Sequence, residues 1–335
     1  MNNSSTKKSA RFGIFFAILL ILLVLAFALS LVAGSQNLFS LENKELAKNI
    51  LIKIRLPRTI LAMLSGMLLA GGGCIFQGFF RNPLAESGVL GITAGATLGV
   101  VLSFLLPFSF AFARLSAMSF FAFLGAIVSG LLIFVFTQRN RQFASSAAMI
   151  LTGTALGTFF SALTSIILIA KQNHLHTVYA WILGSFSGRG WAEVKFIALP
   201  AAVSFVLFIF CARFLDVLST GEQSAQSLGL NLNTARILVL LSGCLSTACS
   251  VCSGGTIGFV GLICPHIMRN LYGAKAKGLL PLSILLGGTL LLVSDTLARI
   301  VIAPGELPVG VITSLVGVPI FIWILLGKNH GGMKI

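Results

Sequence analysis

Long stretches without any Asp, Glu, Lys or Arg recur along the whole of this chain, and they restrict its fold more than any other feature. A helix needs about 20 such residues to cross the apolar core of a bilayer. Of the 335 residues, 57% are apolar and 9% are charged, whereas a soluble domain carries about 25% charged residues. A water-soluble fold is therefore excluded, and we expect one all-α, polytopic membrane domain that spans residues 1–335.

The uncharged stretches predict about ten transmembrane helices. The stretch from 237 to 268 is too long for one helix, and Ser253-Gly254-Gly255-Thr256 at its centre predicts a break near Cys252. The apolar run that follows Arg11 exceeds the roughly 7–15 residues of a signal-peptide core, so we expect it to be retained as the first helix. The expected spans are 12–34, 59–80, 87–113, 115–138, 142–170, 196–212, 237–252, 257–272, 278–294 and 307–327.

The distribution of basic residues predicts the orientation. If the chain starts inside, 13 of the 23 Lys and Arg lie on the inner side and 10 on the outer side, which is the direction of the positive-inside rule. We therefore expect both termini in the cytoplasm. The predicted parts are an N-terminus (1–11), the first helix (12–34), an extracytoplasmic segment (35–56), helices two to ten (57–327) with an inner connection (215–234), and a tail (328–335).

Helices two to five and seven to ten then enter the membrane from opposite sides. Each group also contains a glycine-rich interruption, at Gly71-Gly72-Gly73 and at Gly254-Gly255. This arrangement permits an inverted repeat of the kind found in transporters.

No catalytic or nucleotide-binding motif is visible. The chain lacks a phosphate-binding loop, a zinc-binding helix and a nucleophile elbow, so we expect neither an enzyme nor a bound cofactor or metal. The six cysteines lie in or beside apolar runs and are typical of helix packing. The basic residues that give the net charge of +15 are dispersed along the chain, with no more than two of them adjacent. This distribution argues against a nucleic-acid partner. These features indicate a conduit through the lipid bilayer.

A transporter needs an energy source, and ion-coupled carriers place acids within their spans. Only Asp295 and Glu306 qualify, and Asp295 precedes Arg299 by four residues, the spacing of a helical ion pair. An ion-coupled carrier that uses these acids is the alternative hypothesis. A separate cytoplasmic ATPase explains the absence of internal machinery better.

The inner connection predicts a docking feature for such an ATPase. Thr220 and Gln223 have capping-box spacing, Ala225 and Leu228 are expected on one face, and Gly229 suits a helix C-terminus. We expect a short, nearly uncharged helix here. An ordinary interfacial loop is the alternative.

A cluster of basic residues opposes simple electrostatic rules on the outer side. Lys53, Arg55 and Arg58 surround Pro57, a residue favoured in the first turn of a helix. The cations are therefore expected at the positive end of the second helix, which costs a few tenths to about 1 kcal/mol per charge. A docking partner with carboxylates would make this placement useful, and contact with lipid phosphates is the alternative.

Several motifs in fixed order resemble the FecCD family, the permease subunits of bacterial importers for iron-siderophores, haem and vitamin B12. The resemblance covers about residues 50 to 327. Its motifs are Arg55-Leu-Pro-Arg58, Gln77-Gly-Phe-Phe-Arg-Asn-Pro-Leu-Ala-Glu-Ser-Gly88, Leu90-Gly-Ile-Thr-Ala-Gly-Ala96, Trp181-Ile-Leu-Gly184, Gly221-Glu222 with Leu228-Gly229, Gly258-Phe-Val-Gly-Leu-Ile-Cys-Pro-His266 and Glu306-Leu-Pro-Val-Gly310.

The resemblance implies a ten-helix permease of the type II ABC importers in a bacterial cytoplasmic membrane. It implies a dimer with a second copy or a sister permease, two cytoplasmic ATPase subunits that hold the ATP and magnesium, and an extracytoplasmic binding protein. The family's docking arginines match Arg55, Arg58 and Arg299. Its ATPase-coupling residues match Gly221, Glu222, Ser224, Ala225, Leu228, Gly229 and Leu230. An iron-siderophore is the expected substrate because that class is commonest in the family. The path residues are not indicated.

Overall fold

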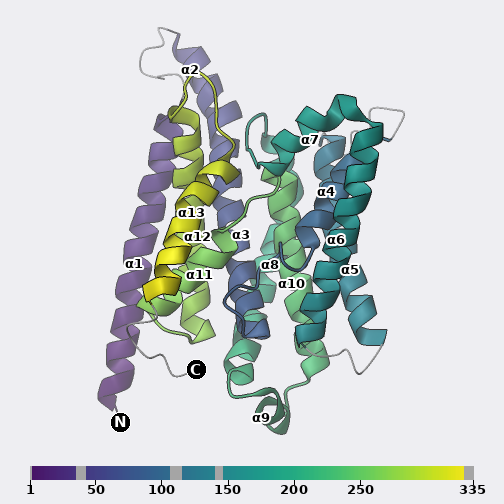
Figure 1. Cartoon of the computed structure of the whole chain (residues 1–335). Coiled ribbons are helices and arrows are strands. Elements are labelled where there is room, and N and C mark those ends of the chain that lie inside the picture. Colours follow the sequence, from purple (N-terminus) through teal and green to yellow (C-terminus); the bar gives the residue numbers. More distant parts are fainter. Residues whose placement is uncertain (1, 35–42, 106–114, 140–145, 328–335) are drawn as a thin grey trace.

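The computed structural model describes residues 2–34, 43–105, 115–139 and 146–327. The predicted tail (328–335), residues 35–42 of the segment between the first two helices and the end of the expected third span therefore lie outside the described residues. Within these ranges the chain is all-helical and contains no strand, as expected (Figure 1). Seven of its helices are long and apolar enough to cross a membrane, and residues 92–103 and 309–323 form shorter apolar helices.

The described residues contain ten helices of at least 12 residues, in agreement with the ten expected spans. These are α1 (Asn2–Val32), α3 (Leu56–Phe80), α4 (Ile92–Ser103), α5 (Ala117–Arg139), α6 (Ser146–Ala170), α8 (Trp191–Leu218), α10 (Leu232–Gly254), α11 (Val260–Leu271), α12 (Ala276–Ile300) and α13 (Val309–Gly327). Short helices α2 (Lys44–Ile50), α7 (Leu175–Ile182) and α9 (Glu222–Ser227) lie between them. The predicted break in the stretch from 237 to 268 is confirmed, because α10 ends at Gly254 and α11 begins at Val260.

The second span starts earlier than expected. Asn43 caps α2 by accepting hydrogen bonds from the backbone N–H groups of Glu45 and Leu46. A π-helical turn (Leu51–Arg55) then joins α2 to α3, so one helix runs from Lys44 to Phe80. The Trp191 indole at the start of α8 donates to the Ile52 carbonyl of this turn, at 2.9 Å. The expectation that Lys53, Arg55 and Arg58 lie at the start of a helix dipole is therefore wrong.

Two groups of four helices share one pattern. In α3 to α6 and again in α10 to α13, the second helix has 12 residues. It also follows a residue with left-handed backbone, Gly91 in the first group and Phe259 in the second. Figure 1 shows α3 starting at the end of the bundle that carries α2, and α10 starting at the opposite end, beside α9. This recurrence is what an inverted repeat requires.

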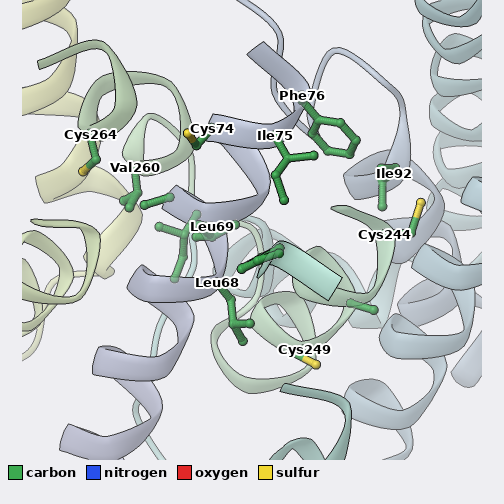
Figure 2. Packing of buried hydrophobic residues seen from close by; sticks show 14 of the residues in the cluster. Leu68, Leu69, Cys74, Ile75, Phe76, Ile92, Cys244, Cys249, Val260 and Cys264 are labelled. Carbon is green, nitrogen blue, oxygen red and sulfur yellow. The ribbon is translucent and has the colours of Figure 1, made fainter. Parts of the chain in front are cut away.

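Helix α3 runs through the centre of the bundle, and its small residues allow close packing. A Cβ atom on Gly73 would lie 1.9 Å from the Gly261 carbonyl oxygen of α11, and one on Gly66 would lie 2.2 Å from the Gly287 oxygen of α12. Large side chains fill the space between these contacts; Phe76 and Ile75 of α3 are fully buried (Figure 2). Close approach of small residues is how helices associate in membranes, where the hydrophobic effect does not drive them together.

Candidate functional site

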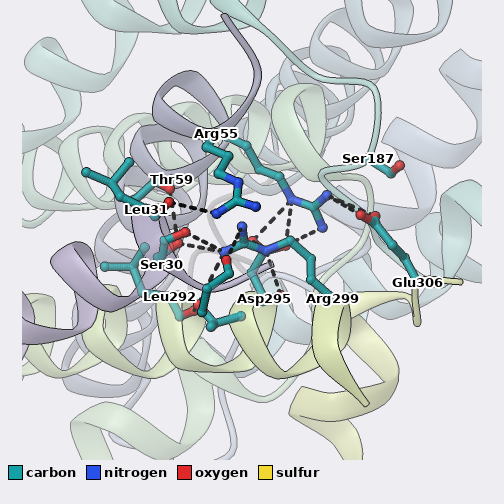
Figure 3. Close-up of polar contacts among 12 residues, drawn as sticks. Ser30, Leu31, Arg55, Thr59, Ser187, Leu292, Asp295, Arg299 and Glu306 are labelled. Atoms are coloured by element: carbon teal, nitrogen blue, oxygen red, sulfur yellow. Dashed lines mark hydrogen bonds and ion pairs between the residues drawn. The ribbon is translucent and has the colours of Figure 1, made fainter. Parts of the chain in front are cut away.

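A group of charged side chains lies buried at the α2 end of the bundle, and we call it the arginine cluster. It contains Arg55, Arg58, Asp295, Arg299 and Glu306. Figure 3 labels all of these except Arg58. Arg58 of α3 donates from Nε and Nη2 to the Asp295 carboxylate, at 2.8–3.2 Å. Its Nη1 atom donates to both oxygens of Glu306, at 2.9 and 3.0 Å. The Arg58 guanidinium therefore joins α12 to the connection between α12 and α13.

Asp295 also pairs with Arg299, four residues later in α12, at 3.2 Å. The helical ion pair expected from this spacing is therefore present. Arg299 donates to the Ser30 hydroxyl at 2.7 Å and to the Ser30 and Ala33 carbonyls at 3.1 and 3.2 Å. These bonds hold the end of α1 against α12.

Arg55 also contacts the end of α1, because its Nη1 atom donates to the Leu31 carbonyl at 3.0 Å. All three predicted docking arginines are thus brought together and are buried within this chain, each with partners of its own. A cavity of about 190 Å³ adjoins them and is lined by Arg55, Arg58, Arg299, Glu306, Gly34, Ile50 and Ile54.

The predicted coupling segment forms a protruding turn at the opposite end of the bundle (Figure 1). We call residues 221–230 the α9 turn. Its short helix ends in a Schellman motif, in which the Leu230 N–H donates to the Ala225 carbonyl at 3.0 Å and the Gly229 N–H to the Gln226 carbonyl at 2.9 Å. Gly229 has φ +86°, so its predicted place at the helix C-terminus is confirmed.

Two details of this segment differ from expectation. Gly221, not Thr220, precedes the helix, and the Thr220 hydroxyl donates to the Val217 carbonyl instead of capping α9. Ala225 is fully buried whereas Leu228 is 71% exposed, so these two residues do not share a face. The helix is too short to keep its three-residue spacing through Leu228, which already leaves helical geometry.

Four interrupted segments meet around a central cavity of about 440 Å³, which sequence reasoning missed. They are the connection between α3 and α4, the end of α7, the break between α10 and α11, and the start of α13. The lining residues are Glu86, Ser87, Gly88, Thr93, Ile182, Leu183, Thr256, Ile257, Gly258, Gly310, Val311, Ser314 and Leu315. Non-helical backbone inside a membrane bundle is tolerated where it lines such a cavity.

Glycines hold these segments together. A Cβ atom on Gly310 would lie 2.2 Å from the Leu183 oxygen, and one on Gly255, which has φ +72°, would lie 2.3 Å from the Trp181 oxygen. Glu86 is the one ionisable side chain among the lining residues. Burial raises the pKa of its carboxyl to about 7. The glycine-rich break and the Glu86 motif were the sequence signals that could have located the cavity.

The cavity and the arginine cluster offer hydrogen-bonding groups and charge for recognition. Among the described residues, no three His, Cys, Asp or Glu side chains are placed to hold a metal ion. The six cysteines are all buried and unpaired.

Comparison with known proteins gives a consistent result along the whole chain. Residues 13–327 match the FecCD transport family. The chain is 37% identical over 287 residues to an uncharacterised ABC transporter permease protein, YvrB of Bacillus subtilis, a match that covers 86% of this chain and 81% of YvrB. It is 35% identical to the hemin transport system permease protein HmuU of Yersinia pestis, over 94% of this chain and 95% of HmuU.

A further relative is the Fe(3+)-citrate import system permease protein YfmE of Bacillus subtilis, 34% identical over 96% of this chain and 97% of YfmE. Among solved structures, one described as an inward-facing conformation of a transporter of the metal-chelate ABC type superimposes with a TM-score of 0.83. It is 31% identical, and the match covers 94% of this chain and 99% of that chain.

Proposed function

Since the chain belongs to the FecCD transport family and is a multi-pass transport permease, we propose that it forms the membrane path of an ABC importer for a metal chelate. The observation that carries this proposal is the central cavity, where four interrupted segments from both helix groups meet. A second copy or a sister permease would complete the path. Iron-siderophore is the substrate that we favour over haem and cobalamin, and the iron-citrate permease YfmE supports an iron chelate.

The α9 turn suits contact with an ATPase. It protrudes from the bundle, and most of its described side chains are exposed. The coupling residues Gly221, Glu222, Ser224, Ala225, Leu228, Gly229 and Leu230 would enter a cleft on the ATPase, with one ATPase subunit for each permease. ATP and magnesium would bind there and not to this chain. This assignment puts the α9 end of the bundle in the cytoplasm, and we propose a cytoplasmic location for both termini as well.

The arginine cluster lies at the opposite end and would face the extracytoplasmic binding protein. Arg55, Arg58 and Arg299 converge on one cavity of about 190 Å³, and guanidinium groups recognise carboxylates with two parallel hydrogen bonds. The ion-coupled alternative gains no support, because Asp295 and Glu306 both contact Arg58.

Reconstitution tests the proposal. The permease, the ATPase and the binding protein encoded beside it are placed in proteoliposomes, and uptake of radioactive iron is measured with a ferric siderophore as substrate. We expect iron uptake to require both ATP and the binding protein. Excess hemin or cobalamin should not reduce this uptake. Iron uptake without the ATPase, driven by a proton gradient, would contradict the proposal.

Two sets of variants test the partner surfaces in the same assay. Proline cannot adopt the φ of +86° at Gly229, so Gly229→Pro should abolish uptake while ATP hydrolysis continues. Gly229→Asn is the control, because asparagine tolerates left-handed backbone. Replacing Arg55 and Arg58 together with Gln should weaken docking of the binding protein and leave assembly with the ATPase intact. If the binding protein docks with unchanged affinity, Arg55 and Arg58 do not belong to the docking surface.

A further inference from the structure

The arginine cluster contains two carboxylates in different surroundings. The Asp295 side chain is 0% exposed, whereas the Glu306 side chain is 27% exposed. Asp295 lies within α12, and Glu306 lies in the non-helical connection that follows it. The two acids therefore differ in how readily they can move.

Asp295 is held from two sides. Arg58 of α3 donates to both of its oxygens, and Arg299 pairs with it along α12. Moving Asp295 would leave two buried guanidinium groups without their shared carboxylate. Such a loss is strongly unfavourable in a buried site, so Asp295 is a fixed support for both arginines.

Among the described residues, Glu306 is held by Arg58, whose Nη1 atom donates to both of its oxygens. It lines the cavity of about 190 Å³ together with the three arginines. The other two nitrogens of Arg58, Nε and Nη2, donate to Asp295. An incoming carboxylate that binds Arg58 through two parallel hydrogen bonds must therefore use Nη1, the atom that Glu306 occupies.

We propose that Glu306 is an internal competitor for Arg58: it occupies Nη1 in the undocked permease and is displaced by an acidic side chain of the binding protein. Asp295 and Arg299 keep the Arg58 side chain in place during this exchange, and Arg299 acts as a positioning residue. The inference rests on the proposed docking function. The exchange replaces one carboxylate by another, so Arg58 is paired before and after docking. Release of the empty binding protein is then favoured by the return of Glu306.

Glu306→Gln tests this role, because glutamine keeps the size of the side chain and removes its charge. The assembled permease and ATPase are placed in lipid nanodiscs, and the affinity and dissociation rate of the binding protein are measured. We expect binding about tenfold tighter, with most of the change in the dissociation rate. Glu45→Gln is the matched control, because Glu45 is an exposed acid at the same end of the bundle, and we expect no change.

Unchanged or weaker binding of Glu306→Gln would overturn the competitor role. If the variant does not assemble, Glu306→Asp replaces it: the shorter side chain keeps the charge but reaches Arg58 less well, and it should tighten binding by a smaller factor. Failure of the competitor role is distinguishable from failure of docking itself. In the first case the Arg55 and Arg58 double variant still loses affinity, and in the second case it does not.

Discussion

Asp295→Asn provides a direct measure of how much the buried ion pairs stabilise the bundle. The substitution keeps the shape of the side chain and removes its charge. Arg58 retains Glu306, but Arg299 keeps only neutral acceptors among the described residues. These are the backbone carbonyl of residue 295, Ser30, Ala33 and Thr296. The Arg299 side chain is only 4% exposed, so bulk solvent does not compensate its charge as it would at the surface.

Breaking a buried ion pair by removing one partner costs about 3–5 kcal/mol. For a chain of 335 residues we expect the midpoint of thermal unfolding to fall by about 4–7 °C. A fluorogenic thiol dye measures it, since all six cysteines are buried and react only as the bundle opens. Glu45→Gln, which alters an exposed acid, should leave the midpoint unchanged.

The double variant Asp295→Asn with Arg299→Gln separates two explanations. If Asp295→Asn destabilises the bundle because the Arg299 charge is left uncompensated, removing that charge should reverse at least half of the fall in the unfolding midpoint. Midpoint losses that simply add would show that the charge of Arg299 is not the cause. A fall of less than 1 °C for the single variant would refute the whole argument.

Three further predictions concern other parts of the bundle. Gly73→Ala should cost about 1–3 kcal/mol, because the new Cβ would lie 1.9 Å from the Gly261 oxygen; in the thiol-dye assay Gly13→Ala, in open space, is the control. Arg81 has left-handed backbone with φ +48°, a conformation that glycine adopts more readily than alanine. The midpoint of thermal unfolding should therefore be several degrees higher for Arg81→Gly than for Arg81→Ala. Equal midpoints would exclude backbone strain at this position. The raised pKa of Glu86 stabilises the fold below the ordinary carboxyl pKa, and this contribution is lost as the pH rises through about 7. Glu86→Gln should therefore flatten the decline of the midpoint between about pH 4.5 and 7, and a decline as steep as in the unaltered protein would contradict it.

The features that the sequence predicted well depend on local pattern. Uncharged length located the helices, and Gly254-Gly255 located the break because glycine there permits the backbone to leave the helix. Gly229 likewise identified the end of α9. Each of these signals is contained within a few consecutive residues.

The start of the second span was mispredicted for a local reason that sequence rules do not capture. Pro57 has no N–H and normally marks a first turn. In the structure the π-helical turn of residues 51–55 comes immediately before it, and the helix continues through both. A wider turn accommodates the missing hydrogen bond, so the proline does not end the helix.

The arginine cluster was predicted only in part, because its central contact is not local. Arg58 and Asp295 are 237 residues apart in the chain, and no spacing rule joins them. The central cavity was missed for a different reason. Apart from Glu86, its lining residues are uncharged, and they look like ordinary helix-packing residues in the sequence.

The α9 turn is shaped by its backbone and not by its exposed side chains. Gly221 and Gly229 provide the unusual φ values at its two ends, and main-chain hydrogen bonds close it. The side chains at 223, 224 and 226–228 point to solvent, so they can be exchanged without altering the turn. Because the backbone conformation does not depend on these side chains, such a turn would keep its shape while its exposed residues change. Under the proposed function, permeases with different substrates would then fit the same cleft on one ATPase.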